Sequence, residues 1–383
     1  MNETPRSKVK ASDAKKNKHA LSAANLQSLK DQILEWGREL GFQQLGITDT
    51  QLEEHEDRLN HWLDRGFNGE MAYMKRHGTR RSRPAELRPG TLTVVSARMD
   101  YMTEEAIPAQ NLMQQPLQAL ISRYALGRDY HKLLRRRLQQ LATRIEQEIG
   151  AFGYRVYVDS GPVLEKALAE KAGLGWIGKH SNLLNRDAGS WFFLGEIYTD
   201  LPLPKDSAGE NYCGNCTRCI DFCPTGAIVG PYLVDARLCI SYLTIELRKA
   251  IPVELRPLIG NRIFGCDDCQ AVCPWNRFAR HSQEDDFRPR NGLDAADLLE
   301  LFSWTEQDFL QRTEGSAIRR IGHSIWLRNI AVALGNALRD APGTTPDRAA
   351  DRSAIVAALQ SRLGDSSELL QEHVAWALAQ HTP

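Results

Sequence analysis

All eight cysteines of this 383-residue chain lie in one segment of sixty-one positions, from 213 to 273. They form a run with gaps of two, two and three residues that ends in Cys-Pro, an isolated cysteine, and a second run with gaps of two and three that also ends in Cys-Pro. Two-cluster ferredoxins use this spacing, because each tight loop presents three thiolates to one [4Fe–4S] cluster while the cysteine before proline binds the other. The segment is therefore predicted to hold two [4Fe–4S] clusters.

The same rule divides the cysteines into two sets of four, with none left over. One cluster is assigned Cys213, Cys216, Cys219 and Cys273, and the other is assigned Cys223, Cys239, Cys266 and Cys269. The isolated Cys239 replaces the missing first cysteine of the second run, so this half departs from a plain ferredoxin repeat.

Eight cysteines also have two other common uses. Structural zinc sites are usually built from two Cys-x2-Cys pairs and do not add a third cysteine and a Cys-Pro ending. Disulfides need an oxidising compartment, and the N-terminal residues contain no apolar signal core. Iron–sulfur clusters remain the favoured interpretation.

The charge balance limits what the rest of the chain does. Lys and Arg total 48, as do Asp and Glu, so the net charge is zero and any nucleic-acid surface must be a local patch. No run of eighteen apolar residues is present, so no membrane span is expected. We expect a cytoplasmic monomer.

Hydrophobic periodicity predicts an α+β multidomain protein. The expected parts are a disordered basic tail (1–24), an α/β domain (25–205), a ferredoxin-type domain (206–290) and a helical domain (291–383). Strands are predicted over Phe42–Ile47, Leu92–Ser96, Tyr154–Val158 and Trp191–Ile197, and helices over Leu26–Leu40, Leu117–Gly150 and Val163–Ala172. Near the C-terminus, Leu327–Asn336 aligns with Gln371–Gln380 at an offset of 44 residues, within the range of about 40–47 for HEAT repeats.

The residues alone do not identify a second cofactor. No G-x-G-x-x-G fingerprint and no P-loop is present. Composition and spacing lead only to a two-cluster reductase with an unidentified cofactor pocket.

Several longer motifs resemble the epoxyqueuosine reductase family. The matching segments are Tyr154–Glu165, Gly175–Asn182, Gly189–Glu196, the cysteine loops with their isolated Cys239, and Ile318–Arg320 with Leu327–Asn329. The resemblance covers nearly the whole chain beyond the Lys-rich tail. It implies cobalamin in a nitroreductase-like α/β domain, two [4Fe–4S] clusters, and a relation to reductive dehalogenases. It also implies an external electron donor and reduction of the epoxide of epoxyqueuosine at the wobble position of tRNA.

Asp159 follows a predicted strand and starts an Asp-Ser-Gly-Pro turn. From the residues alone, an Asp that caps the next helix is the favoured interpretation. The resemblance instead implies that Asp159 is the proton donor for the opening epoxide, and such an acid needs a pKa raised by burial.

The resemblance also suggests further contacts. Cobalamin is expected to meet polar residues in three segments: Ser122, Arg123 and Tyr124; Lys179, Ser181 and Asn182; and Ser241 and Asp267 beside the second cluster. For tRNA the expected residues are Arg319, Arg320 and Arg328, with His323, Lys132 and Arg135–Arg137 as possible additions. The alternative is that these charged residues only form a solvated helix face, as such runs commonly do.

Two competing functions were considered. A reductive dehalogenase-like enzyme for a small molecule shares the cofactors but needs no basic helical module. A non-catalytic electron carrier needs only the cluster domain, so the large α/β region argues against it.

Overall fold

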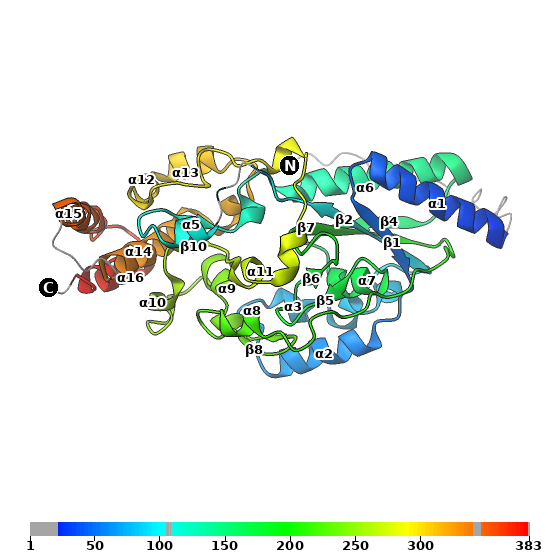
Figure 1. Cartoon of the computed structure of the whole chain (residues 1–383), viewed down its shortest axis with the longest axis horizontal. Helices are drawn as coiled ribbons and strands as arrows, with labels where there is room; N and C mark the ends of the chain where they lie inside the picture. The colour runs from blue at the N-terminus through cyan, green and yellow to red at the C-terminus, as the bar shows by residue number, and fades with distance from the viewer. Residues whose placement is uncertain (1–21, 105–106, 108, 340–345, 382–383) are drawn as a thin grey trace, which may run out of the picture.

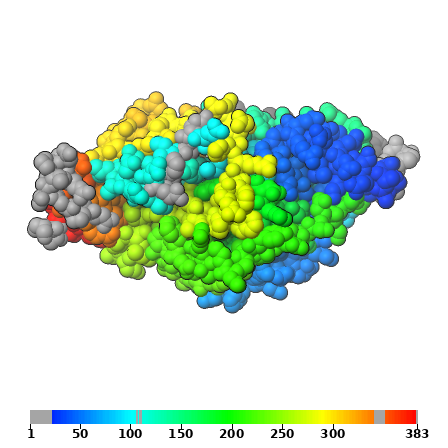
Figure 2. Space-filling view, in the orientation of Figure 1, coloured from blue at the N-terminus to red at the C-terminus, as the bar shows by residue number. Residues whose placement is uncertain are grey.

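The computed structural model describes residues 22–104, 107, 109–339 and 346–381. The predicted basic tail therefore lies outside the described residues up to position 21. Figure 2 shows that the described parts form one elongated body without a gap between them.

A four-stranded antiparallel sheet organises the N-terminal half, with strand order β1-β2-β7-β4. The strands are β1 (Gln44–Thr48), β2 (Thr93–Asp100), β7 (Phe192–Thr199) and β4 (Tyr154–Tyr157). Alternate residues point to opposite faces, as the period of a strand requires. One face packs its apolar residues against α1 (Ala23–Glu39) and α6 (Tyr130–Ile149), and α7 (Glu165–Lys171) covers the other (Figure 1).

The α6 helix is shorter than the sequence pattern predicts. Asp129 caps its N-terminus, and the helix ends at Gly150. The residues before it form the short strand β3 (Leu120–Ile121) and a 3-10 turn, so the predicted helix from Leu117 is wrong there. The reason is tertiary: β3 pairs in parallel with β10 (Arg262–Phe264), more than a hundred residues away.

Short elements carry the cysteine segment. They are α8 (Arg218–Asp221), β8 (Ile228–Gly230), β9 (Leu233–Val234), α9 (Ile240–Ile245), α10 (Arg256–Ile259) and α11 (Asp268–Ala271). The early helix α2 (Glu53–Asp64) packs on this region, where Trp62 Nε1 donates a hydrogen bond of 2.7 Å to the carbonyl of Val234. Further short elements are α3 (Tyr73–Arg76), α4 (Pro84–Leu87), α5 (Ala109–Met113), β5 (Trp176–Ile177) and β6 (Leu183–Leu184).

The C-terminal part is helical, as predicted. Its helices are α12 (Leu298–Ser303), α13 (Glu306–Arg312), α14 (His323–Arg339), α15 (Pro346–Gln360) and α16 (Glu368–Ala379). The two aligned segments fall in α14 and α16, which pack side by side. Gly335 permits this close packing, because a Cβ there would lie 2.6 Å from the ring of Trp376.

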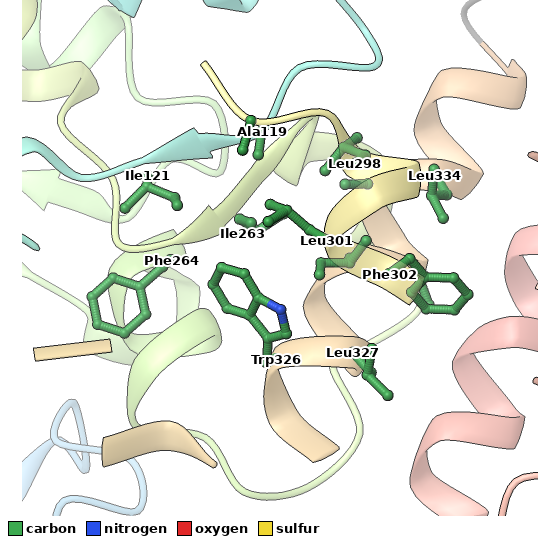
Figure 3. Close-up of a cluster of buried hydrophobic side chains, with 14 of the residues drawn as sticks. Ala119, Ile121, Ile263, Phe264, Leu298, Leu301, Phe302, Trp326, Leu327 and Leu334 are labelled. Carbon is green, nitrogen blue, oxygen red and sulfur yellow. The ribbon is translucent and has the colours of Figure 1, made fainter. Parts of the chain in front are cut away.

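The largest hydrophobic core joins parts that the sequence analysis assigned to different domains. Figure 3 shows Ala119 and Ile121, from the N-terminal half, beside Ile263 of β10 and Trp326 of α14. Position 205 therefore does not divide separate cores. Among the described residues, no helix is long and apolar enough to cross a membrane.

Candidate active site

A cavity of about 1700 Å³ opens where the sheet, the cysteine segment and the C-terminal helices meet. Its lining includes Phe193 of β7, Asp159 after β4, Cys239 and Ser241 at the start of α9, and Arg320 before α14. Small-molecule pockets usually measure about 300–1,000 Å³. This cavity therefore has room for a ligand larger than an ordinary metabolite.

Asp159 lies at the end of β4, as predicted, and its side chain is half exposed to the cavity. Its φ of 46° is left-handed, a conformation that Asp adopts more readily than most residues. Asp159 Oδ2 lies 3.0 Å from Nε2 of His131, and His131 Nδ1 lies 2.6 Å from Oδ1 of Asp129. Asp129 also caps α6, which fixes the position of the histidine ring.

Of the three hydrogen-bonded residues Asp129, His131 and Asp159, the histidine carries the proton. Burial raises the pKa of Asp159, but the hydrogen bond and positive charge of His131 outweigh it and hold that pKa below its usual value. Burial lowers the pKa of His131, whereas its hydrogen bonds to Asp129 and Asp159 raise it, to about 9. The protein residues around Asp159 thus lower its pKa, and the raised value that an acid role requires stays a prediction for the site with its cofactor. At neutral pH the carboxylate of Asp159 accepts a hydrogen bond from a protonated His131.

A second acid supports the Asp159 turn from behind. The carboxylate of Glu165, the first residue of α7, accepts a hydrogen bond from the backbone N–H of Asp159. Burial raises the pKa of Glu165, and the nearby charge of Asp159 raises it further, to about 8. Glu165 is thus a protonated acid near neutral pH.

Three of the predicted cofactor residues, Tyr124, Asn182 and Ser241, line the cavity. Ser122 and Asp267 are buried beside it and hydrogen-bond to each other, and the other oxygen of Asp267 accepts from the backbone N–H of Arg123 at 2.8 Å. Their direct contact with a cofactor stays a prediction.

Lys179 and Ser181 also lie outside the cavity lining. Lys179 Nζ donates to the carbonyls of Gly214 and Cys216, at 2.7 and 3.0 Å, so it braces the first cysteine loop. The carbonyl of Ser181 accepts from Lys166 Nζ at 2.5 Å. Their contact with a cofactor likewise stays a prediction.

The first predicted ligand set converges in space. A second cavity, of about 200 Å³, is lined by Cys213, Cys216, Cys219 and Cys273. Trp176 donates from Nε1 toward the sulfur of Cys213 at 3.5 Å. This arrangement brings the Cys-Pro cysteine of the second run to the loop of the first.

The cysteines of the second set also lie close enough together to affect one another's pKa. Burial raises the pKa of the Cys269 thiol well above its usual range, and the neighbouring Cys239 and Cys223 raise it further. Burial acts in the same way on Cys266, which also lies close to Cys239. Cys239 lines the large cavity as well, so the second set lies nearer to it than the first.

The predicted RNA-binding arginines differ sharply in exposure. Arg319 and Arg320 are exposed at the rim of the large cavity, and Arg320 pairs with Glu246 at 2.8 Å. Arg328 is 0% exposed, and its guanidinium donates to the carbonyls of Leu243 and Leu247. The prediction that Arg328 contacts RNA is wrong, because α14 turns this side chain into the protein.

Sequence reasoning missed the partners of Asp159. Asp129 and His131 carry a visible signal, a capping Asp two residues before a His at a helix start, but only the fold shows that they face Asp159. Glu165 was noticed only as part of a longer motif.

Two family descriptions match parts of the chain. Residues 212–276 match the "4Fe-4S double cluster binding domain", which contains all eight cysteines. Residues 81–160 match "Epoxyqueuosine reductase QueG, DUF1730" and end just after Asp159.

Whole-chain comparisons extend this result. The chain is 60% identical to the epoxyqueuosine reductase of Pseudomonas aeruginosa, over 94% of this chain and 97% of that protein. It is 58% identical to the Escherichia coli enzyme, over 93% and 90% of the two chains. It also resembles the structure of epoxyqueuosine reductase from Streptococcus thermophilus, with a TM-score of 0.80 and 26% identity over 93% and 92% of the chains.

A crystal structure of epoxyqueuosine reductase with an epoxyqueuosine-modified tRNA-Tyr stem loop has a TM-score of 0.77 to this chain. That match has 25% identity and covers 92% of this chain and 99% of the other. Together with the cavity, the Asp159–His131 pair and the cysteine sets, these relatives establish that the chain belongs to the epoxyqueuosine reductase family.

Proposed function

We propose that this protein reduces epoxyqueuosine to queuosine at the wobble position of tRNA, the last step of queuosine biosynthesis. The observation that carries the proposal is the Asp159–His131 acid pair in a large cavity that is also lined by Cys239. The relatives named epoxyqueuosine reductase, one of them bound to a modified tRNA stem loop, support this substrate. We propose a cytoplasmic location, which a tRNA substrate supports.

Two [4Fe–4S] clusters and cobalamin are the cofactors of the proposal. The cavity fits cobalamin in size, and its lining combines the aromatic rings of Phe192 and Phe193 with the polar side chains of Tyr124, Asn182 and Ser241. Such a mixture suits a macrocycle whose rim carries amide groups. When bound, cobalamin would supply a strongly reducing metal centre that no side chain can match, and the clusters would supply its electrons singly.

The chain's own residues then handle the proton. Opening an epoxide leaves negative charge on oxygen, which an acid within reach must neutralise. His131 holds a proton at neutral pH, and its Nε2 lies 3.0 Å from Oδ2 of Asp159, with both side chains lining the cavity. We assign Asp159 as the group that delivers this proton and His131 as the group that refills it.

Arg319 and Arg320 are proposed to hold the phosphates of the anticodon stem, since they stand exposed at the cavity rim. The α14 and α16 pair supports the view that the C-terminal helices form a HEAT-like platform beneath this rim.

The proposal has three further parts: the protein is a monomer, its sheet domain is nitroreductase-like, and an external donor supplies the electrons. A dehalogenase-like reaction on a small molecule is not favoured, because the whole-chain relatives are epoxyqueuosine reductases.

The decisive experiment is complementation. A strain without its own epoxyqueuosine reductase would receive either the wild-type gene or the Asp159→Asn variant, and its tRNA nucleosides would be measured by mass spectrometry. We expect queuosine with the wild type and accumulated epoxyqueuosine with the variant. Epoxyqueuosine that persists with the wild-type gene would reject the proposed function.

A further inference from the structure

A row of polar side chains crosses the central sheet behind the Asp159 turn. In the strand register, Glu196 of β7 lies opposite Ser96 of β2 on one side and Tyr157 of β4 on the other. Tyr198, two residues further along β7, points to the same face and packs beneath α7. Tyr157 stands two residues before Asp159, so this row runs directly to the proposed proton donor.

Glu196 is an unusual residue for this place. It is 0% exposed, and neither of its carboxyl oxygens has a hydrogen-bond partner in the described structure. The hydroxyl groups of Ser96 and Tyr198 also lack partners there. A bare carboxylate in such surroundings is extremely costly, so Glu196 must carry a proton.

Glu165 connects this buried acid to the active site. Its carboxyl group accepts the backbone N–H of Asp159, and it is close enough to Glu196 for its charge to raise the pKa of that residue further after burial. Titratable or charged groups face Glu165 from several elements: Asp159 on the turn, His131 on α6, Lys166 on α7, Glu196 on β7, and Arg81 before α4.

The proposed reaction needs more protons than the Asp159–His131 pair holds. Converting an epoxide to an alkene breaks two C–O bonds, consumes two electrons from the reduced metal centres and two protons, and releases one water molecule. His131 can refill Asp159 once, because it carries a single exchangeable proton in excess of its neutral form. The second proton must come from another group while the large substrate covers the cavity.

We propose that Glu165 and Glu196 form a proton reserve that supplies this second proton to Asp159. In the transfer, the Glu165 carboxyl group loses its proton to the Asp159 carboxylate, Glu196 refills Glu165, and solvent reloads the acids after the product leaves. The inference rests on the proposed function for its substrate, but the buried protons can be observed without it.

The first test is an infrared pH titration of the protein without substrate. A protonated carboxyl group has a carbonyl stretch that is separate from the bands of a carboxylate. We expect difference spectra to show one protonated acid that disappears in Glu196→Gln, and one that titrates near pH 8 and disappears in Glu165→Gln. Spectra in which neither variant loses a protonated-acid signal would overturn the proposal.

The second test measures one turnover of chemically reduced enzyme on epoxyqueuosine-containing tRNA. The reserve is full below about pH 8 and empties as pH rises, so the wild-type rate should fall through that value. In Glu165→Gln we expect roughly a tenfold lower rate, at the lower edge of proton-transfer effects, and no rate decrease near pH 8. Binding of tRNA and iron content should not change.

Glu170→Gln is the matched control. Glu170 lies on the same helix, but its carboxylate accepts from the backbone N–H of Ile177, away from Asp159. It should keep the wild-type rate, pH profile and infrared spectrum. A wild-type rate and profile in both Glu165→Gln and Glu196→Gln would also overturn the proposal. If the wild-type enzyme left epoxyqueuosine unchanged, the proposed function would be rejected. The infrared spectra would still show whether Glu165 and Glu196 hold protons.

Discussion

The sheet region and the C-terminal helices each bury an ionisable side chain completely, but only the one in the helices has hydrogen-bond partners. Arg328 of α14 and Glu196 of β7 are each 0% exposed. The guanidinium of Arg328 donates to the carbonyls of Leu243, Leu247 and Lys249 at 2.6 to 2.8 Å. The carboxyl oxygens of Glu196 have no hydrogen-bond partner among the described residues.

This difference separates a structural role from a functional one. A buried charge with all its donors satisfied joins elements together, and Arg328 ties α14 to α9 and to the segment that follows α9. A buried acid without partners weakens the fold, so its presence beside an active site needs another explanation.

The largest effect is expected at the site itself. Asp159→Asn keeps the size of the side chain but removes the acid, so turnover should fall by about 10²- to 10⁴-fold. Iron content and tRNA affinity should remain at wild-type levels. Asp31→Asn, on the exposed face of α1, is the control and should be fully active. Full activity of Asp159→Asn would remove this residue from the mechanism.

Arg328→Met tests the satisfied charge. Removing the guanidinium leaves several buried carbonyls without donors, and we expect the free energy of unfolding to fall by about 3–5 kcal/mol, as measured by urea denaturation. Arg312→Met is the control, because Arg312 forms an exposed pair with Glu300 at 3.3 Å and should cost less than about 1 kcal/mol. Equal effects of the two substitutions would show that burial of Arg328 contributes nothing special.

Glu196→Gln tests the unsatisfied acid and should change stability in the other direction. Burial, followed by the charges of Glu165 and Asp159, raises the folded-state pKa of Glu196 well above its usual value. Folding is therefore not opposed by Glu196 below its unfolded-state pKa. As the pH rises above that value, the unfolded chain releases the proton more readily than the folded protein, and stability is lost. The amide of Gln does not titrate, so at pH 7 we expect the free energy of unfolding of the variant to be higher than that of the wild type. The gain should vanish near pH 4, and a loss of stability at pH 7 would contradict a protonated Glu196.

The comparison also explains what the sequence could predict. The cysteine spacing is local and has one strong interpretation, so the cluster segment was recognised before the fold was known. Asp159 was singled out through the family resemblance, because the residues alone, at a strand end before a Gly-Pro turn, favour a helix cap. The same reasoning failed at β3, where pairing with a distant strand overrides the helical pattern that runs up to α6.

Residues that depend on register or on helix rotation were not predictable. Glu196 becomes part of the site because β7 places it between β2 and β4 and α7 covers it. Arg328 lies nine residues after Arg319 in a basic stretch, yet only the packing of α14 shows that one is buried and the other exposed. Charge in a sequence does not reveal which face of a helix it occupies.

The smallest expected effect concerns the exposed side of that same arginine stretch. Arg319→Glu should weaken binding of the tRNA anticodon stem loop, because a phosphate contact becomes a repulsion, whereas Arg328→Lys should leave the affinity of the folded protein unchanged. For one lost phosphate contact we expect the slope of log affinity against log salt to fall by about 1. The measurement is the dissociation constant of the stem loop at several salt concentrations. Because Arg320 is already paired with Glu246, its reversal should weaken binding less than that of Arg319. An unchanged salt slope in Arg319→Glu would place the RNA on another face and leave the rim arginines as ordinary surface residues.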